Sequence, residues 1–314
     1  MAFIDPKIDF AFKKIFGSAE HTDILISFLN AILYNGRREI IDVEIRNPYL
    51  PTQLEDLKET YLDIQAVLND GTFVVIEMQM VNVHAFLKRI LYNAAKRYTT
   101  QLTKGEAYER LLPVIALTIT NFVLFDTTPN VKTHFQMRER RGRLTYPAND
   151  LQLVFVELPK FRKPLTKLRT LADKWLYFLR EAHQLQEIPP NMATLQPIER
   201  AFDLASEANM STEELLAFEK RTRYVHEWEM GIKLAEEKAA REGRKKGFQQ
   251  GIEQGIEQGI EQGLAKGRED GERRKALEIA MRLLVDMSDE AISTLTGLSL
   301  EDVTNLREQL DATN

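Results

Sequence analysis

The chain has 314 residues, of which 44% are apolar and 28% are charged, and its formal net charge is −5. This composition is typical of a globular protein with one substantial core and one or two smaller modules, and it excludes disorder throughout. The absence of cysteine excludes a disulfide framework and thiolate zinc sites. The acidic balance provides no overall attraction for nucleic acid, so any such contact must come from local basic clusters.

Features of the N-terminus and of the apolar segments bear on location. The N-terminal segment carries Asp5 and Asp9 and lacks the apolar stretch of a signal peptide. No uninterrupted apolar run approaches the ~20 residues that a membrane-spanning helix needs. We therefore expect a cytoplasmic protein with no membrane partner.

Helical and strand patterns are mixed up to about residue 230. Apolar residues at helical spacing and runs of β-branched and aromatic residues mark the two kinds of element. In chain order, we predict helices over 8–16 and 22–34, strands over 61–68 and 72–81, a helix over 83–103, strands over 112–120, 133–139 and 151–158, and helices from 165 to about 241. This mixture predicts an α/β core followed by helices.

The turn Asn69-Asp70-Gly71 sets the register of a predicted hairpin. If these residues form a three-residue loop with Gly71 in the left-handed conformation, Leu68 pairs with Thr72. The numbers of paired residues then sum to 140, because 68 and 72 do. The turn therefore predicts every pairing along the two strands.

Two carboxylates, Asp63 and Glu77, lie directly opposite each other in this register, and Gln79 shares their face. Opposed residues have Cβ atoms ~4.5–5.5 Å apart, so both carboxylates can bind one divalent cation. Like charges this close on a half-buried sheet repel unless a cation or a proton intervenes. A two-residue loop would place Asp63 opposite Met78 instead. The alternative interpretation is that Asp63 and Glu77 belong to a solvated outer face.

The order of Asp63, a hairpin, Glu77-Met78-Gln79 and a helix resembles the core of the PD-(D/E)XK nucleases, in which an Asp and a second acidic residue on adjacent strands hold the metal ion. The chain more closely resembles the Rpn family of recombination-promoting nucleases, which are also described as transposases of the PD-(D/E)XK class. Three further segments carry this resemblance. The first is 9–17, with the sequence DFAFKKIFG, and the second is the helix that contains Arg89, Tyr92, Tyr98 and Gln101. The third consists of the glycine tetrads and the short helical tail. The resemblance covers nearly the whole chain.

The resemblance implies that Asp63 and Glu77 bind the metal ion and that Asp63, Glu77 and Gln79 form the catalytic set. Mg²⁺ suits oxygen ligands of this kind, and other divalent cations are alternatives. At the third position the superfamily has lysine, which orients the attacking water and stabilises charge on the phosphate. Gln79 can form hydrogen bonds there but carries no charge. Leu62 stands where the superfamily name has proline.

The positive charge missing at Gln79 must come from another side chain if the superfamily chemistry holds. We hypothesise that it comes from Lys13, Lys14, Arg89 or Lys96, which lie near the motif or on the neighbouring predicted helices. Two basic stretches farther along are candidates for contacts with backbone phosphates, although solvated loop charge is an equally good interpretation. They are Lys132, Arg138, Arg140, Arg141 and Arg143, and Lys160, Arg162, Lys163, Lys167 and Arg169.

Glycine recurs every four residues from position 243 to position 271 and forms an internal repeat. On a helix, these glycines would form a slowly turning row beside Ile252, Ile256, Ile260 and Leu264. The eight glycines would cost such a helix roughly 8 kcal/mol relative to alanine. We therefore predict a helix that forms on self-association of the C-terminal region, with a homodimer favoured. A flexible linker is the alternative.

The segment after the repeat predicts short helices over 276–285, 288–295 and 299–310. Ser288 and Ser299 occupy N-cap positions, and Gly297 ends the second helix. The pattern resembles a helix-turn-helix, but the proposed second helix has only one cation, Arg307. A helix with a single cation is poorly suited to bind in the major groove of DNA. A helical cap that binds a partner is at least as good an interpretation.

The sequence as a whole therefore predicts four parts and a nuclease function. The parts are a PD-(D/E)XK restriction-endonuclease-like α/β core over 1–165, a helical extension over 166–240, the glycine-tetrad repeat over 241–275 and a small helical tail module over 276–314. The resemblance implies a Mg²⁺-dependent DNA endonuclease associated with recombination or mobile-element activity. Two alternatives are a catalytically weak DNA-binding relative and a regulatory protein organised by the glycine repeat.

Overall fold

A computed structural model describes residues 2–46, 49–50, 60–61, 63–83, 85–142 and 144–311. The chain forms two compact units, Met1–Ile232 and Lys233–Asn314. The predicted boundaries after residues 165, 240 and 275 stay predictions. In the part of the chain that the structure describes, no helix has the length and apolar character needed to cross a membrane.

A six-stranded mixed sheet forms the centre of the first unit, in the order β1-β4-β5-β6-β8-β7. Strands β5, β6 and β8 are parallel, and the other pairings are antiparallel. The strands are β1 (Val43–Arg46), β4 (Ile64–Leu68), β5 (Phe73–Gln79), β6 (Val114–Thr120), β7 (Lys132–Phe135) and β8 (Leu151–Glu157), and a separate two-stranded sheet contains β2 (Tyr49–Leu50) and β3 (Thr60–Tyr61). The mixed sheet flanked by helices confirms the predicted PD-(D/E)XK-like α/β fold.

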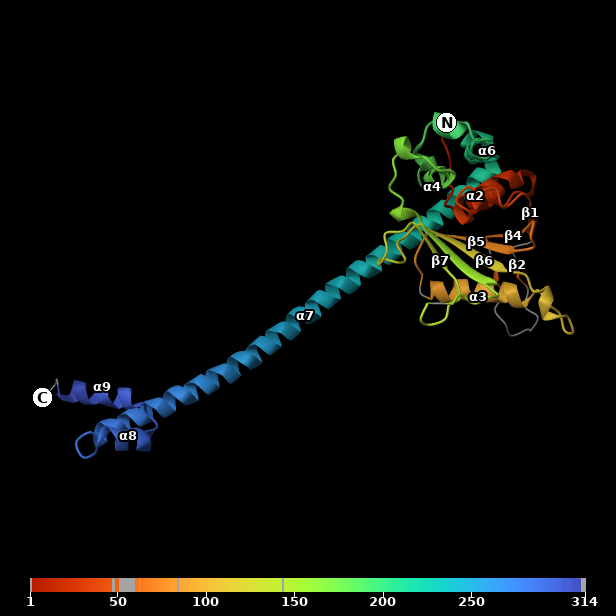
Figure 1. Cartoon of the computed structure of the whole chain (residues 1–314). Coiled ribbons are helices and arrows are strands. Elements are labelled where there is room, and N and C mark those ends of the chain that lie inside the picture. The colour runs from red at the N-terminus through yellow and green to blue at the C-terminus, as the bar shows by residue number, and fades with distance from the viewer. Residues whose placement is uncertain are drawn as a thin grey trace. The chain divides into compact units, whose positions relative to one another are not determined.

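Helices cover both faces of the sheet (Figure 1). The α-helices are α1 (Asp9–Phe16), α2 (Thr22–Leu33), α3 (Phe86–Thr99), α4 (Leu171–Glu181), α5 (Pro190–Ala193), α6 (Gln196–Ala205), α7 (Thr212–Leu283), α8 (Asp289–Thr296) and α9 (Leu300–Asp311). Short 3-10 helices lie at Ala19–His21, Tyr108–Arg110, Leu158–Lys160, Leu165–Lys167, Ala182–Gln184 and Glu207–Asn209. Helices α2, α4 and α6 lie on one face of the sheet, and α3 lies on the other.

The alternation of side chains along the strands separates two cores. On β5, Val74 and Ile76 point into the larger core with α1, α2, α4 and α6, while Val75 points toward α3. Aromatic side chains fill the larger core, among them Phe16, whose ring centroid lies 5.6 Å from that of Trp175. Residues of α4 and α6 thus share a core with the sheet.

The second unit has a small core of its own. Ala280, Leu284, Ile292, Leu298 and Val303 form it. The predicted N-caps are confirmed, since Ser288 accepts from the Ala291 amide and Ser299 from the Asp302 amide, and Gly297 ends α8 in the left-handed conformation. The separate helix predicted over 276–285 is wrong, because no residue stops α7 before Leu283 and Gly271 keeps a helical backbone.

Arg307 holds the C-terminal helices together. Its guanidinium donates to Asp289 Oδ1 at 2.7 Å, to the Leu284 carbonyl at 2.5 Å and to the Met287 carbonyl at 2.7 Å. The cation considered for DNA contact is therefore engaged in contacts that stabilise the small core.

Candidate metal centre

The hairpin of β4 and β5 has the predicted register. The Leu68 amide donates to the Thr72 carbonyl at 2.9 Å, and Gly71 adopts the left-handed conformation with φ +87°. Ile64 pairs with Ile76 at the far end, so the paired numbers sum to 140, as the three-residue loop requires. Asp63 directly precedes β4, and the same register continued by one residue sets it opposite Glu77.

Asp63 stands between the hairpin and α1. Its Oδ2 accepts a hydrogen bond from the Met78 amide at 2.7 Å, and Lys13 Nζ lies 3.6 Å from its Oδ1. Burial, together with the negative charges of Asp9 and Glu77, raises the pKa of Asp63 to about 7, although the Met78 amide and Lys13 oppose the shift. The site therefore disfavours the negative charge on Asp63.

Glu77 is buried beneath α3. Asn93 Nδ2 donates to its Oε1 at 2.6 Å, and Arg89 Nη2 lies 3.9 Å from its Oε2. Burial raises the pKa of Glu77, although the Asn93 hydrogen bond and the Arg89 charge oppose the shift. Glu77, like Asp63, is held in surroundings that favour its neutral form.

Gln79 lies at the end of β5 on the same face as Glu77. Its Nε2 donates to the Val81 carbonyl at 2.9 Å, and its Oε1 accepts from Arg89 Nη2 at 2.6 Å. The amide is therefore held at both ends. Its hydrogen bond to Arg89 brings a positive charge to the third motif position.

The four candidate cations have different surroundings. Lys13 contacts Asp63 and lies 2.7 Å from Asp9 Oδ1, while Arg89 contacts Gln79 and Glu77. Lys14 instead pairs with Glu214 of α7 at 2.7 Å, and Lys96 is buried on α3. Lys13 and Arg89 therefore lie beside the candidate site carboxylates.

Asp9 and Asn93 are two residues beside the carboxylates that the sequence did not single out. Asp9 acts on Asp63 from α1, and Asn93 holds Glu77 from α3. A signal for Asn93 exists in the sequence, because Arg89, Asn93 and Lys96 follow helical spacing and form a polar stripe beside the buried Ile90 and Ala94. A polar stripe on the sheet-facing side of a helix indicates polar partners on the sheet.

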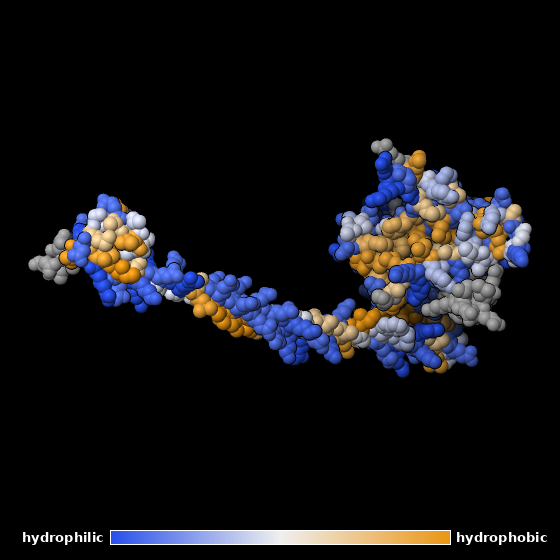
Figure 2. Space-filling view, turned by 90° about the horizontal axis from the view of Figure 1, so that it is seen from below, coloured by the Kyte–Doolittle hydropathy of each residue, from blue (hydrophilic) through white to orange (hydrophobic). Residues whose placement is uncertain are grey.

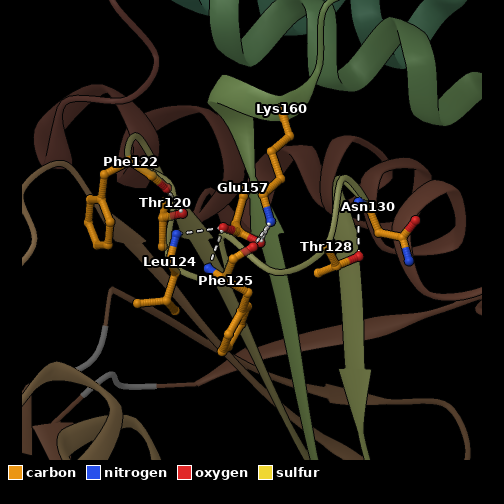
Figure 3. A network of polar contacts seen from close by, with 8 residues as sticks. All are labelled: Thr120, Phe122, Leu124, Phe125, Thr128, Asn130, Glu157 and Lys160. Carbon is orange, nitrogen blue, oxygen red and sulfur yellow. Dashed lines mark hydrogen bonds and ion pairs between the residues drawn. The ribbon is translucent and has the colours of Figure 1, made fainter. Parts of the chain in front are cut away.

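Glu157 is a further carboxylate on this face of the sheet, at the end of β8. It is fully buried and accepts hydrogen bonds from the Leu124 amide at 2.5 Å, the Phe125 amide at 3.0 Å and Lys160 Nζ at 2.6 Å (Figure 3). Lys160 also donates to the Phe125 carbonyl at 2.6 Å. Glu157 therefore anchors the loop after β6 and is already neutralised.

The basic stretches include residues engaged elsewhere. Lys132 Nζ donates to the Ile32 carbonyl at 2.7 Å, and Lys163 pairs with Asp173 at 2.7 Å. Together with Lys160, these contacts favour a structural role for part of each stretch. Arg143 and Leu62 lie outside the described residues.

The donor set fits a divalent cation. Burial raises the pKa of both Asp63 and Glu77 and so disfavours their charged forms. A bound cation would favour the charged, deprotonated forms instead. In the described residues no group of three or more His, Cys, Asp and Glu side chains is placed to hold a metal ion. Mg²⁺ is commonly bound by one or two carboxylates with water completing its shell.

Comparison with known proteins gives one family. The model of the PD-(D/E)XK nuclease family transposase matches residues 6–235, which include α1, the hairpin, α3 and the first part of α7. No curated protein and no solved structure gives a significant match.

Proposed function

Because this chain belongs to the PD-(D/E)XK nuclease family transposases, we propose that it is a metal-dependent DNA endonuclease that hydrolyses phosphodiester bonds. The family membership confirms the predicted resemblance and supports a nuclease-like or transposase-like function. The arrangement of Asp63 opposite Glu77, with Arg89 joined to Gln79, carries the proposal.

Asp63 and Glu77 would hold the cation, with Mg²⁺ as the proposed ion. When bound, a divalent cation supplies positive charge to the scissile phosphate and lowers the pKa of a coordinated water. The Met78 amide and Asn93 hold the two carboxylates through hydrogen bonds of 2.7 Å and 2.6 Å. These contacts orient the ligand oxygens before the ion arrives.

Arg89 and Lys13 would supply the charge that Gln79 lacks. Their side chains are about half exposed, at 46% and 42%, so both can reach an incoming phosphate. A guanidinium can donate two parallel hydrogen bonds to phosphate oxygens. Arg89 thus supplies the positive charge that lysine supplies in the superfamily motif. Gln79 holds the Arg89 side chain in place through its hydrogen bond.

Plasmid nicking by the wild type and by Asp63→Ala, in Mg²⁺, Mn²⁺ and Ca²⁺, tests the proposal. We expect metal-dependent nicking by the wild type that Asp63→Ala loses. Glu44→Gln is a matched control, because Glu44 is an exposed carboxylate on the neighbouring strand β1. Equal nicking by the wild type and Asp63→Ala, or none by the wild type, would contradict the proposal.

Arg89→Ala tests the replacement for the motif lysine. Loss of one transition-state donor is expected to slow nicking by about a hundredfold. Lys88→Ala removes the same charge from an exposed position one residue away and is expected to leave nicking unchanged. Nicking by Arg89→Ala at the wild-type rate would remove Arg89 from the mechanism.

A catalytically weak DNA-binding protein of the same fold is the second candidate. The uncharged Gln79, whose amide is engaged at both ends, favours it. DNA binding without nicking under any cation would support this alternative. We further propose recombination or mobile-element activity as the role, and a homodimer formed through the C-terminal region.

A further inference from the structure

A cavity of about 230 Å³ opens directly beside the candidate metal centre. Asp63 and Gln79 line one side of it, and residues from the first part of α7 line another. The α7 residues Arg221, Tyr224, Val225 and Trp228 follow the i, i+3, i+4, i+7 spacing of one helix face. All of these residues belong to the unit Met1–Ile232.

Two aromatic rings stand on this wall. Tyr224 and Trp228 are 52% and 44% exposed, and their ring centroids lie 5.6 Å apart with an interplanar angle of 81°. Tryptophan is highly buried on average, whereas tyrosine is intermediate. Here both side chains line the same cavity as Asp63, so a planar group that enters it can contact an aromatic side chain beside the candidate metal centre.

Positive charge lies beside the rings. A second cavity, of about 480 Å³, shares Arg221 and Tyr224 with the first and is also lined by Lys220 and Phe10. In the described part of the chain no ion pair joins Lys220 or Arg221 to another residue. These two cations are therefore available to an anionic ligand.

The first part of α7 is fixed against α1. Lys14 Nζ lies 2.7 Å from Glu214 Oε1, and Phe218 packs against the larger core. The wall that carries Arg221, Tyr224 and Trp228 is thus held in place from the preceding turns of the same helix. Because these side chains are already ordered, binding of a ligand to this wall loses little side-chain conformational entropy.

We propose that this cavity binds one unstacked nucleotide of the DNA strand next to the scissile phosphate. Its base contacts both Tyr224 and Trp228, and its phosphates contact Arg221 and Lys220. Aromatic stacking combined with a basic groove is how proteins hold single-stranded nucleic acid. A base can stack on a protein side chain in this way only when it is unpaired or turned out of the duplex, so we expect the substrate strand to be single-stranded or locally unpaired there. This inference rests on the proposed function and specifies its substrate.

Tryptophan fluorescence provides a direct test in the full-length protein. The chain has two tryptophans, and Trp175 is fully buried with its indole N–H donating to Ser27. A short oligothymidylate in Ca²⁺ should therefore quench Trp228, and an abasic oligonucleotide of equal length should not. Trp228→Phe should lose the fluorescence change but keep most of the affinity, because the ring remains. An equal change with the abasic strand would overturn the stacking.

Single substitutions separate the contribution of base stacking to binding from that of positive charge. Tyr224→Ala and Trp228→Ala should each weaken oligothymidylate binding by about tenfold, whereas Tyr108→Ala, an exposed tyrosine elsewhere, should not. Arg221→Ala should reduce the salt dependence of binding by about one counterion. Arg223→Ala removes the same charge two residues away, outside both cavities, and should leave that dependence unchanged. Wild-type affinity in both alanine variants of the aromatic pair would overturn the proposal.

Failure of the nuclease function gives a different result. Quenching of Trp228 with no nicking under any cation would retain the nucleotide cavity and reject the endonuclease. Metal-dependent nicking that is lost in Asp63→Ala, without quenching and with normal rates in Tyr224→Ala and Trp228→Ala, would reject the cavity and retain the endonuclease.

Discussion

Asp63, Glu77 and Glu157 are acidic residues on one face of the sheet region, and their partners give them different roles. Glu157 has two backbone amides and the Lys160 ammonium around it, so its charge is compensated within the protein. Asp63 and Glu77 have fewer donors, and burial raises the pKa of both. A carboxylate whose charge the fold leaves undercompensated is the one available to a cation from solution.

The pKa of Asp63 predicts how metal binding depends on pH. Its value of about 7 lies well above the ordinary 3.8, and a cation binds the deprotonated form. We expect affinity for Mg²⁺ to rise as pH increases through about 7, measured by isothermal titration calorimetry. The same shift means that the metal-free protein loses stability as pH rises from 3.8 through about 7, because the folded state holds a proton that the unfolded chain releases.

Asp63→Asn is the control for this pH effect. The variant cannot titrate at position 63, so the stability of the metal-free protein should vary less with pH than in the wild type. A wild-type affinity that is constant through neutral pH would show that Asp63 is already ionised in the metal-free protein.

At the scale of elements, the β4–β5 turn sets the spacing of the two proposed ligands. Gly71 has a positive φ, and the Asp70 carboxylate accepts a hydrogen bond from the Thr72 amide at 2.9 Å. Every pairing down to Asp63 follows from these few residues, because a slip of one residue turns each side chain to the other face. The loop after β6 depends instead on Glu157 and Lys160, far along the chain.

Substitution of Gly71 tests the turn. A Cβ at Gly71 would lie 3.0 Å from Leu112 Cδ1, and the left-handed conformation is unfavourable for side chains. We expect Gly71→Val to lower the free energy of unfolding by about 1–3 kcal/mol, measured by urea denaturation. Gly71→Asn should cost less, since asparagine tolerates this conformation. Equal losses for Val and Asn would argue against the left-handed turn.

Removal of the Lys160 ammonium tests the loop anchor. Lys160→Met leaves the fully buried Glu157 without its cation, and breaking such a pair costs about 3–5 kcal/mol. The double variant Lys160→Met, Glu157→Gln should be more stable than Lys160→Met alone, because it no longer buries a charge. A double-mutant cycle of denaturant unfolding measures this coupling, and additive losses would contradict it.

At the scale of the whole molecule, the candidate metal centre lies in the unit Met1–Ile232 and the glycine repeat in the unit Lys233–Asn314. The repeat is helical in α7, and Ile252, Ile256, Ile260 and Leu264 are 46–71% exposed. Figure 2 shows a hydrophobic strip along the otherwise hydrophilic surface of this helix. A single chain leaves this row in water, and a second helix would cover it.

Charges on the apolar row test self-association. Ile256→Glu with Ile260→Glu should shift the protein from dimer to monomer in sedimentation equilibrium, because the row can no longer be buried. Gln258→Glu with Gln262→Glu adds the same charge at polar positions of the same helix and should leave the dimer intact. A wild-type chain that sediments as a monomer would contradict the proposed homodimer.

Some features of this protein could be predicted from the sequence because neighbouring residues determine them. The three-residue turn, the strand register that it sets and the caps at Ser288 and Ser299 all depend on residues close together in the chain. The short strands β1 and β2 escaped prediction, since they carry too few residues for a clear periodic pattern.

Only the tertiary structure decided which side chains surround the carboxylates. Lys13 and Arg89 contact them, Lys14 binds Glu214 instead, and Lys160 neutralises Glu157. Tyr224 reaches the same cavity as Asp63 from 161 residues away, by the difference of their numbers. Contacts at such separations depend on how helices pack on the sheet, and side-chain spacing along the chain shows which face of a helix packs but not which distant residues it meets.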